Sequence, residues 1–293
     1  VHIPPFICTL SGMLLWRGVA LILLGGMTIS PFPSTFMNIF NSYLPDLALE
    51  QATDELFEAS EDAYYALVDK NAQITLIVTL IIAVICCFVT VASAVCSRAS
   101  KKRKGYSVSS AGSFMGKQVV LCAVIMLVGW LLAQDKGLPL ILVILAVIVG
   151  IYSYYTQNTV PGRYLYAIGG NEKAARLSGV NTDNVMFFAY TNMGFIAAVA
   201  GLVCAARLNS AAPTVGTSYE MDAIASCFIG GASAYGGTGT VGGAVIGAVF
   251  MGILNNGMSI LGVDANWQRA VKGLVLLLAV IFDVVSKKRS SSK

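Results

Sequence analysis

Long apolar runs that carry almost no charge recur along this chain, and they limit the folds that it can adopt. Residues 74–95, for example, contain no Asp, Glu, Lys or Arg. A transmembrane helix needs about 20 mostly apolar residues, so this run is long enough to cross a bilayer. Only 12% of the residues are charged, whereas soluble domains contain about 25%. The sequence therefore predicts an all-α polytopic membrane protein and argues against a soluble enzyme.

Eight runs are candidates for membrane segments, and some of them are short or broken. They comprise residues 6–27, 74–95, 119–133, 138–155, 185–206, 221–235, 241–254 and 270–285. We expect the two runs between residues 221 and 254 to be half-spans or strongly tilted helices, because each is shorter than a bilayer requires. The predicted fold is a membrane helix bundle with about eight membrane segments, organised as one transmembrane domain over residues 1–293.

The distribution of charge predicts the orientation of these segments, since loops rich in Lys and Arg stay in the cytoplasm. Thirteen cations fall in the loops of one side, against three acids, and the opposite loops are acidic. We therefore expect both ends of the chain to be cytoplasmic. Residues 28–73 then form an acidic extracytoplasmic loop, residues 156–184 a cytoplasmic loop, and residues 286–293 a basic cytoplasmic tail. The acidic loop, part of it helical, is either a solvated decoration or a docking surface for an external partner.

Several other classes of site are disfavoured by composition. His2 is the only histidine, and none of the seven cysteines belongs to a C-x-x-C pair, so we expect no metal site, disulfide or bound cofactor. The net charge of +4 is too small and too scattered for a nucleic-acid surface. The chain opens at Val1 in an apolar stretch with neither an initiator Met nor a signal-peptide pattern, and we expect it to be a fragment.

A glycine-rich segment offers a motif with two interpretations. Gly237, Gly239 and Gly242 spell G-x-G-x-x-G, which after a strand would indicate a dinucleotide-binding loop. Here an apolar, helix-like run precedes the glycines, and no acidic residue lies about 20 residues further on to hold a ribose. Gly239, Gly243 and Gly247 instead continue as G-x-x-x-G-x-x-x-G, which predicts close helix packing.

Charged residues inside apolar runs are costly and are therefore functional candidates. Arg17 lies near the middle of the first run. It is either part of a functional site or a structural residue that pairs with helix-end carbonyls, and the sequence leaves both open. Arg269 and Lys272 lie at the outer end of the last run, where we expect them to snorkel to the interface. We assign no function to these two residues or to Asp283 near the other end.

A short helix is predicted within the loop of residues 156–184. Asn171 can cap a helix that begins at Glu172, Glu172 and Arg176 are spaced as an i,i+4 ion pair, and Gly179 suits a left-handed C-cap. Two turns of helix are unstable alone in water, so the helix must dock on another surface. That surface is either the rest of this chain or a cytoplasmic partner.

Five blocks of sequence together resemble the permease subunits of bacterial monosaccharide ABC importers of the ribose, xylose and galactose type. The most informative block is GRYLYAIGGNEKAARLSGVN at residues 162–181. The others are PPFICTL at 4–10 with Arg17 and Gly18, ARLNSAAPTVGTSYEMDAIA at 206–225, GGASAYGGTGTVGG at 230–243 and LNNGMSILGV at 254–263. The acidic loop is similar to that of the xylose or multiple-sugar branch. The family's N-terminal membrane segments have no counterpart here.

The resemblance implies a permease subunit of the bacterial cell membrane that moves a monosaccharide inward. It also implies three partners besides membrane lipid: ATP-binding cassette ATPase subunits, an extracytoplasmic sugar-binding protein and a second permease copy. The chain contains no Walker A motif, so ATP hydrolysis is expected on a separate subunit and this chain is not an enzyme. The residues expected to couple to the ATPase are Gly169, Gly170, Asn171, Glu172, Ala174, Ala175, Arg176, Ser178 and Gly179. We expect Ala174 and Ala175 to be small enough for a groove of that partner.

A sugar path needs neutral donors and acceptors within an otherwise apolar passage, and short or broken helices are where such groups line cavities. The candidates are Arg17, Tyr190, Thr191, Asn192, Asn209, Ser210, Asn255 and Asn256. An equally good interpretation is that the amides cap helix ends or bridge neighbouring helices.

The alternative function is an ion-coupled secondary sugar transporter. Such carriers usually place an Asp, Glu or His at the middle of the membrane. We assign the acids Glu220 and Asp222 to an outer loop, so the sequence offers no such group. An intramembrane enzyme is also disfavoured, because the single histidine leaves no nucleophile–base pair or metal cluster.

Overall fold

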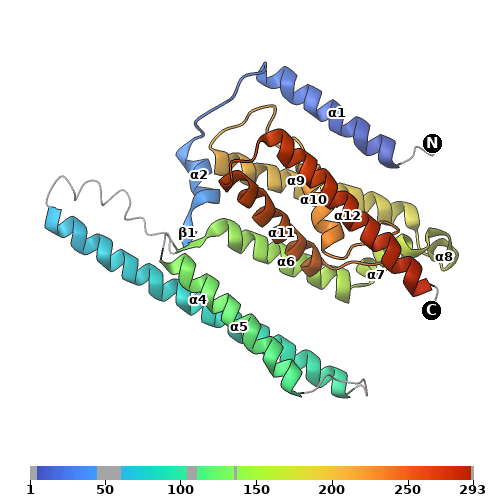
Figure 1. Ribbon diagram of the computed structural model, residues 1–293, viewed down its shortest axis with the longest axis horizontal. Helices are drawn as coiled ribbons and strands as arrows, with labels where there is room; N and C mark the ends of the chain where they lie inside the picture. Colours follow the sequence, from blue (N-terminus) through green and yellow to red (C-terminus); the bar gives the residue numbers. More distant parts are fainter. Residues whose placement is uncertain (1–4, 45–60, 104–110, 135–136, 292–293) are drawn as a thin grey trace. The chain divides into compact units, whose positions relative to one another are not determined.

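The computed structural model describes residues 5–44, 61–103, 111–134 and 137–291, and nearly all of these residues are helical. The elements in chain order are α1 (Pro5–Leu24), α2 (Ser34–Asn41), β1 (Tyr43–Leu44), α4 (Glu61–Arg103), α5 (Ala111–Ala133), β2 (Leu138–Pro139), α6 (Leu140–Asn158), α7 (Val160–Gly170), α8 (Glu172–Leu177), α9 (Thr182–Leu208), α10 (Tyr219–Ile229), α11 (Val241–Ile260) and α12 (Ala265–Ser291). The predicted all-α bundle is confirmed (Figure 1).

Among the residues that the structure describes, six helices are long and apolar enough to cross a membrane, so the predicted count of about eight segments is not confirmed. They are Ile7–Leu24, Ala72–Cys96, Gly112–Ala133, Leu140–Asn158, Thr182–Leu208 and Val241–Ile260. The predicted run 221–235 is helical for only the 11 residues of α10, about 16 Å at 1.5 Å per residue. The helix α12 carries Arg269, Lys272 and Asp283 among its apolar residues. The helix α11 extends to Ile260 and is longer than predicted.

The contacts divide the chain into two compact units. Unit 1 comprises residues 1–32 and 145–293, and unit 2 comprises residues 33–144. In unit 2, α4 and α5 form an antiparallel hairpin, with β1 and β2 paired beside it (Figure 1). The helices approach closely where a Cβ atom placed on Gly129 would lie 2.7 Å from Cβ of Ala83. Neither α2 nor the strand pair was predicted.

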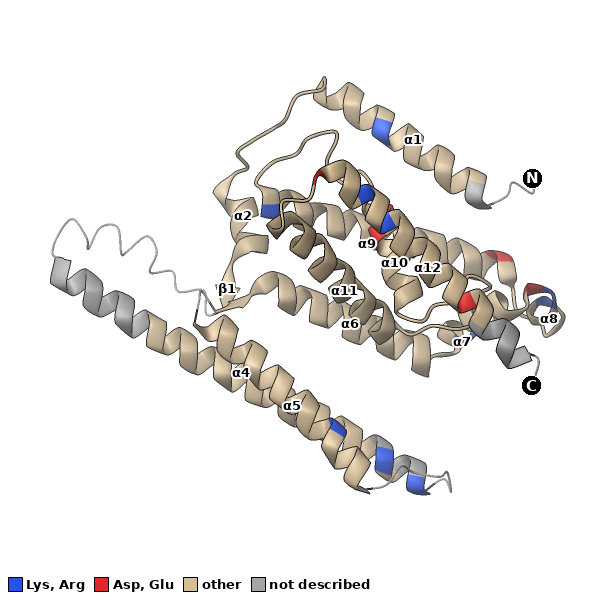
Figure 2. Ribbon diagram, viewed as in Figure 1, with Lys and Arg blue, Asp and Glu red and all other residues tan. Residues whose placement is uncertain are grey.

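The acidic loop was predicted to include a surface helix, and most of that stretch, residues 45–60, lies outside the described residues. Its last part belongs to α4, which begins at Glu61 and continues into the apolar span. Basic side chains gather where α4 ends and α5 begins (Figure 2). There the guanidinium of Arg98 lies 4.5 Å from the ring centroid of Phe114. The orientation of this basic end across the membrane stays a prediction.

In unit 1, the short helix α10 packs against α11 and α12. Glycines allow the close approach of α10 and α11: a Cβ atom on Gly247 would collide with the carbonyl of Ser226, and one on Gly243 would collide with the carbonyl of Gly230. The two helices are therefore antiparallel and in backbone contact. The close packing predicted for the G-x-x-x-G-x-x-x-G pattern is confirmed.

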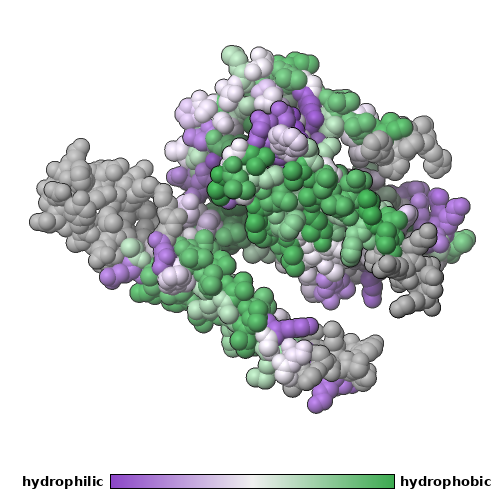
Figure 3. All heavy atoms as spheres, viewed as in Figure 1, coloured by the Kyte–Doolittle hydropathy of each residue, from purple (hydrophilic) through white to green (hydrophobic). Residues whose placement is uncertain are grey.

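Much of the apolar surface of unit 1 is exposed, as on the faces of α11 and α12 in Figure 3. Exposed apolar side chains include Trp16, Ile22, Leu23, Ile246 and Leu277. An apolar exterior of this extent is unfavourable in water and suits a lipid environment. Together with the six apolar spans, it identifies a multi-pass membrane protein.

Candidate coupling and translocation sites

The short helix α8 forms as its capping residues predict. The Asn171 side chain accepts a hydrogen bond from the backbone N–H of Ala174 at 3.0 Å. At the other end Gly179 is left-handed, with φ +84°, and the N–H groups of Gly179 and Val180 donate to the carbonyls of Arg176 and Ala175 at 3.1 Å. This is a Schellman C-cap. The predicted start and end of the helix are confirmed.

The surroundings of α8 differ from the prediction in three respects. It is not alone in its loop, because α7 precedes it, begun by the side chain of Thr159, which accepts a hydrogen bond from N–H of Gly162 at 3.2 Å. It packs on α7 and α9, and Ala175 faces inward at 5% exposure. The expectation that Ala175 fits a partner's groove is therefore wrong. Arg176 pairs with Asp183 at 3.4 Å rather than with Glu172.

The outward face of α8 is where a partner could bind. Leu177 is 91% exposed, and Glu172, Lys173 and Ala174 are also exposed. A leucine exposed to this extent on a polar loop costs free energy unless another surface covers it. Both docking surfaces that the sequence left open are thus compatible with the structure: the inner face docks on this chain, and the outer face is free to bind a partner.

Backbone contacts join the end of α7 to the loop between α10 and α11. We call Gly169, Gly170, Gly236 and Gly237 the glycine junction. A Cβ atom on Gly169 would lie 2.8 Å from the amide nitrogen of Gly237, and one on Gly237 would lie 2.9 Å from Cα of Gly170. The hydroxyl of Tyr166 donates to the carbonyl of Gly239 at 2.9 Å. The predicted coupling residues Gly169 and Gly170 therefore contact a segment that the sequence did not connect with them.

The same loop is attached to α12 by Asp283, to which the sequence analysis assigned no function. Its Oδ2 accepts hydrogen bonds from the Ser233 hydroxyl at 3.0 Å and from N–H of Ala234 at 3.1 Å. The loop thus lies between α7 on one side and α12 on the other. We call this part of unit 1, formed by α7, α8 and residues 230–240, the α8 end.

The predicted path residues of α9 lie in two kinds of environment. Asn192 is half-buried and accepts a 2.5 Å hydrogen bond from the hydroxyl of Tyr152 on α6, so it bridges neighbouring helices. Tyr190 and Thr191 are exposed on α9.

Asn209 and Ser210 lie at the end of α9. Asn209 is left-handed, with φ 49°. Its Oδ1 accepts from N–H of Phe32, and its carbonyl accepts from the Ser30 hydroxyl, both at 2.9 Å. N–H of Ser210 donates to the carbonyl of Ala205. The helix-capping interpretation therefore fits Asn209, which also holds the segment after α1.

Arg17 finds a carboxylate rather than helix-end carbonyls. Its guanidinium lies 3.3 Å from Glu220, in the first turn of α10, and both side chains are partly exposed. The contact connects α1 with α10 inside unit 1. Glu220 is therefore the partner of Arg17 rather than an isolated charge in an outer loop.

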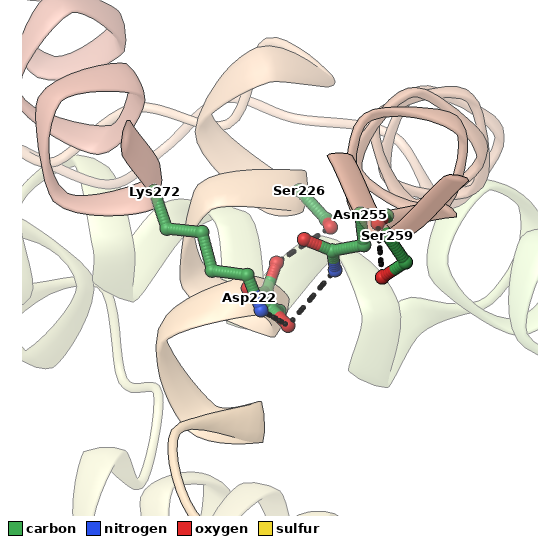
Figure 4. A network of polar contacts seen from close by, with 5 residues as sticks. All are labelled: Asp222, Ser226, Asn255, Ser259 and Lys272. Atoms are coloured by element: carbon green, nitrogen blue, oxygen red, sulfur yellow. Dashed lines mark hydrogen bonds and ion pairs between the residues drawn. The ribbon is translucent and has the colours of Figure 1, made fainter. Parts of the chain in front are cut away.

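A polar cluster lies where α10, α11 and α12 meet (Figure 4). We call Asp222, Ser226, Asn255, Ser259 and Lys272 the Asp222 cluster. Oδ2 of Asp222 accepts from the Lys272 ammonium at 2.9 Å and from the Asn255 amide at 3.2 Å. The two hydroxyls donate within their own helices, Ser226 to the carbonyl of Asp222 and Ser259 to that of Asn255. The side chains of Lys272 and Asp222 are only 19% and 20% exposed.

The Asp222 cluster corrects two sequence predictions. Lys272 does not snorkel away from the bundle but pairs with Asp222, and Asp222 lies against α11 rather than in an outer loop. The sequence contained part of the signal for this ion pair, because Asp222 and Lys272 each lie within an apolar run. Of the predicted path residues, Asn255 belongs to the cluster, whereas its neighbour Asn256 is exposed.

The fold defines a multi-pass membrane protein, and comparison with known proteins gives its class. Residues 63–280 match the family described as branched-chain amino acid transport system / permease component. The chain belongs to this family. It is 35% identical over 287 residues to the xylose transport system permease protein of Haemophilus influenzae, covering 98% of this chain and 68% of that protein. No solved structure matches.

Two further relatives agree. The xylose transport system permease protein of Escherichia coli K12 is 34% identical over 98% of this chain and 66% of its own length. The ribose import permease protein of the same strain is 44% identical over 54% of this chain and 49% of its own length. The alignments thus span about two-thirds of the xylose permeases and half of the ribose permease. The resemblance inferred from the sequence is confirmed, and the chain is a multi-pass protein of the inner membrane.

Proposed function

We propose that this chain is the permease subunit of an ATP-driven monosaccharide importer. The observation that carries the proposal is the alignment of 98% of the chain with xylose permeases at 34–35% identity. The family description names branched-chain amino acids, but the relatives aligned over most of the chain are sugar permeases. A monosaccharide is therefore the cargo that we assign.

The outward face of α8 is the surface that we assign to an ATPase partner. Leu177 is its exposed apolar centre, with Glu172 and Lys173 beside it. A small apolar contact rimmed by charges is typical of a protein interface. Ala175 anchors α8 to its own bundle, so a push on α8 moves α7 with it.

The glycine junction transmits that movement to the loop before α11. Movement of α7 displaces Gly169 and Gly170, which are in backbone contact with Gly236 and Gly237. Backbone atoms at van der Waals distance cannot yield as a side chain does, so the loop must follow. The loop continues directly into α11.

The remaining partners and the orientation complete the proposal. An extracytoplasmic sugar-binding protein delivers the cargo, and a second copy of the permease forms the other half of the passage. Both ends of the chain are cytoplasmic, with residues 28–73 outside, residues 156–184 and 286–293 inside, and one transmembrane domain overall. A cysteine at Ser60 should react with a membrane-impermeant maleimide from outside, and one at Ser107 should not. The opposite labelling would reverse the orientation.

The alternative is an ion-coupled secondary transporter, and Asp222 makes it worth testing because its partly buried carboxylate packs against the candidate span α11. Reconstituting the permease with its ATPase and binding protein in vesicles separates the two. We expect uptake of a pentose to require internal ATP and to persist when ionophores remove all ion gradients. Uptake driven by a gradient without ATP would establish the alternative instead.

A further inference from the structure

The Asp222 cluster has the composition of a ligand site rather than of a simple brace. We propose that it is a hydroxyl-binding subsite for the neutral sugar within the passage, with Asp222 and Lys272 as its charged members. The inference rests on the proposed function and adds two residues that the sequence analysis did not place in the path.

The position of the Asp222 cluster along its three helices supports a ligand site. Asn255 lies five residues before the end of α11 at Ile260, and Lys272 lies seven residues after the start of α12 at Ala265. At 1.5 Å per residue these offsets are about 7.5 Å and 10.5 Å, so Asn255 and Lys272 lie one to two turns inside the ends of their helices, beside the first turn of α10 that carries Asp222. The helix α10, which supplies Asp222, is too short to span. Transporters typically place substrate sites at such interrupted helices.

The balance of charge in the Asp222 cluster suits a neutral ligand. The Lys272 ammonium and the Asp222 carboxylate are 2.9 Å apart and compensate each other. A site without net charge gives no advantage to an ion, whereas a neutral polyol can exchange with the internal contacts without leaving either charge uncompensated. The cluster is mostly buried but still accessible to a ligand, since one-fifth of each charged side chain remains exposed.

The Asp222 cluster also has unused hydrogen-bonding capacity. Oδ1 of Asp222 and Oδ1 of Asn255 are buried, and neither has a hydrogen-bond donor among the residues that the structure describes. An ammonium carries three donors. A sugar hydroxyl both donates and accepts, so it can bond to Asp222 and to Lys272 at once. The same pairing inside the protein competes with the sugar, which keeps binding weak and release fast.

The test compares uptake of xylose and of its single-deoxy analogues by the reconstituted complex. The double variant Asp222→Leu/Lys272→Met removes both charges together, which avoids leaving one charge buried without a partner. Asp222→Asn keeps the shape of the side chain and serves if the double variant assembles poorly. Arg269→Met is the matched control, because it removes an exposed cation from the same helix outside the cluster.

We expect the double variant to assemble with most of the wild-type thermal stability but to take up xylose about tenfold more slowly, the effect of losing a hydrogen bond to a charged group. The wild type should transport one deoxy analogue poorly, and Asp222→Asn should reduce this discrimination. Arg269→Met should behave as the wild type. Wild-type uptake and unchanged discrimination in both cluster variants would overturn the inference alone. Absence of sugar uptake by the wild-type complex would instead reject the proposed function.

Discussion

The helix α10 lies between two contact regions of opposite kinds. At the α8 end, its following loop meets α7 mainly through the glycine junction, backbone against backbone, with one side-chain hydrogen bond from Tyr166 to Gly239. At its other end, Asp222 meets α11 and α12 through charged and amide side chains. A backbone contact transmits displacement because it cannot rearrange. Side-chain hydrogen bonds can change partners when a ligand arrives. In the function that we propose, the first region transmits force and the second handles the cargo.

The largest expected effect comes from breaking the ion pair on one side only. Lys272→Met leaves the Asp222 carboxylate sheltered without its cation, and such losses cost several kcal/mol for fully buried pairs. Because Asp222 keeps one-fifth of its exposure, we expect about 2 kcal/mol of destabilisation. The midpoint of thermal unfolding in detergent measures it.

The matched comparison is the exposed pair Arg176–Asp183, whose side chains are 64% and 79% exposed. Arg176→Gln should change stability by less than about 0.5 kcal/mol. Adding Asp222→Leu to Lys272→Met should restore most of the lost stability. If Lys272→Met and Arg176→Gln lower the midpoint equally, the Asp222 pair is no more sheltered than a surface pair.

A glycine substitution tests the other region. Gly236 has φ +79°, and a Cβ atom there would collide with the carbonyl of Gly169. Gly231 has φ +87° with open space around its Cβ position. Both alanine variants carry the same left-handed strain of about 1 kcal/mol, so only Gly236→Ala disturbs the junction. We expect uptake to fall about tenfold more in Gly236→Ala, an extra cost of about 1.4 kcal/mol. Equal rates would remove the junction from the mechanism.

The smallest expected effect is at the surface of α8. Leu177→Ser removes the apolar centre of the proposed ATPase contact without altering packing, so uptake should fall about threefold to tenfold through a loss of interface contact. Leu261→Ser is the control, since Leu261 is also highly exposed, at 81%, but lies at the C-terminal end of α11, away from the α8 end. Pull-down of the ATPase with each variant shows whether the loss is one of binding. A permease with Ser at position 177 that binds and transports normally would move the contact elsewhere.

The local features of this fold could be read from the sequence. Asn171 and Gly179 act within four residues of themselves, so their capping roles follow from spacing and backbone preference alone. The orientation of Ala175 could not be read, because it depends on which face α7 and α9 cover.

The Asp222 cluster is a second feature that the sequence could not predict. Asp222 and Lys272 are 50 residues apart, and nothing local indicates that they meet. The end of α10 was also missed, because apolar residues continue after Gly230 and Gly231, where the helix stops. Which side chains pair across a bundle depends on how the helices pack. Periodicity and composition could therefore predict the helical segments but not the Asp222 cluster.

We propose that ATP hydrolysis drives sugar transport by moving the α8 end. The most direct measurement is the number of sugars transported per ATP hydrolysed, by wild type and Gly236→Ala in the same reconstituted vesicles. We expect the variant to retain most of its ATPase activity, stimulated by the binding protein, while the sugar transported per ATP falls about tenfold. An unchanged ratio, with both activities reduced together, would exclude this route of coupling.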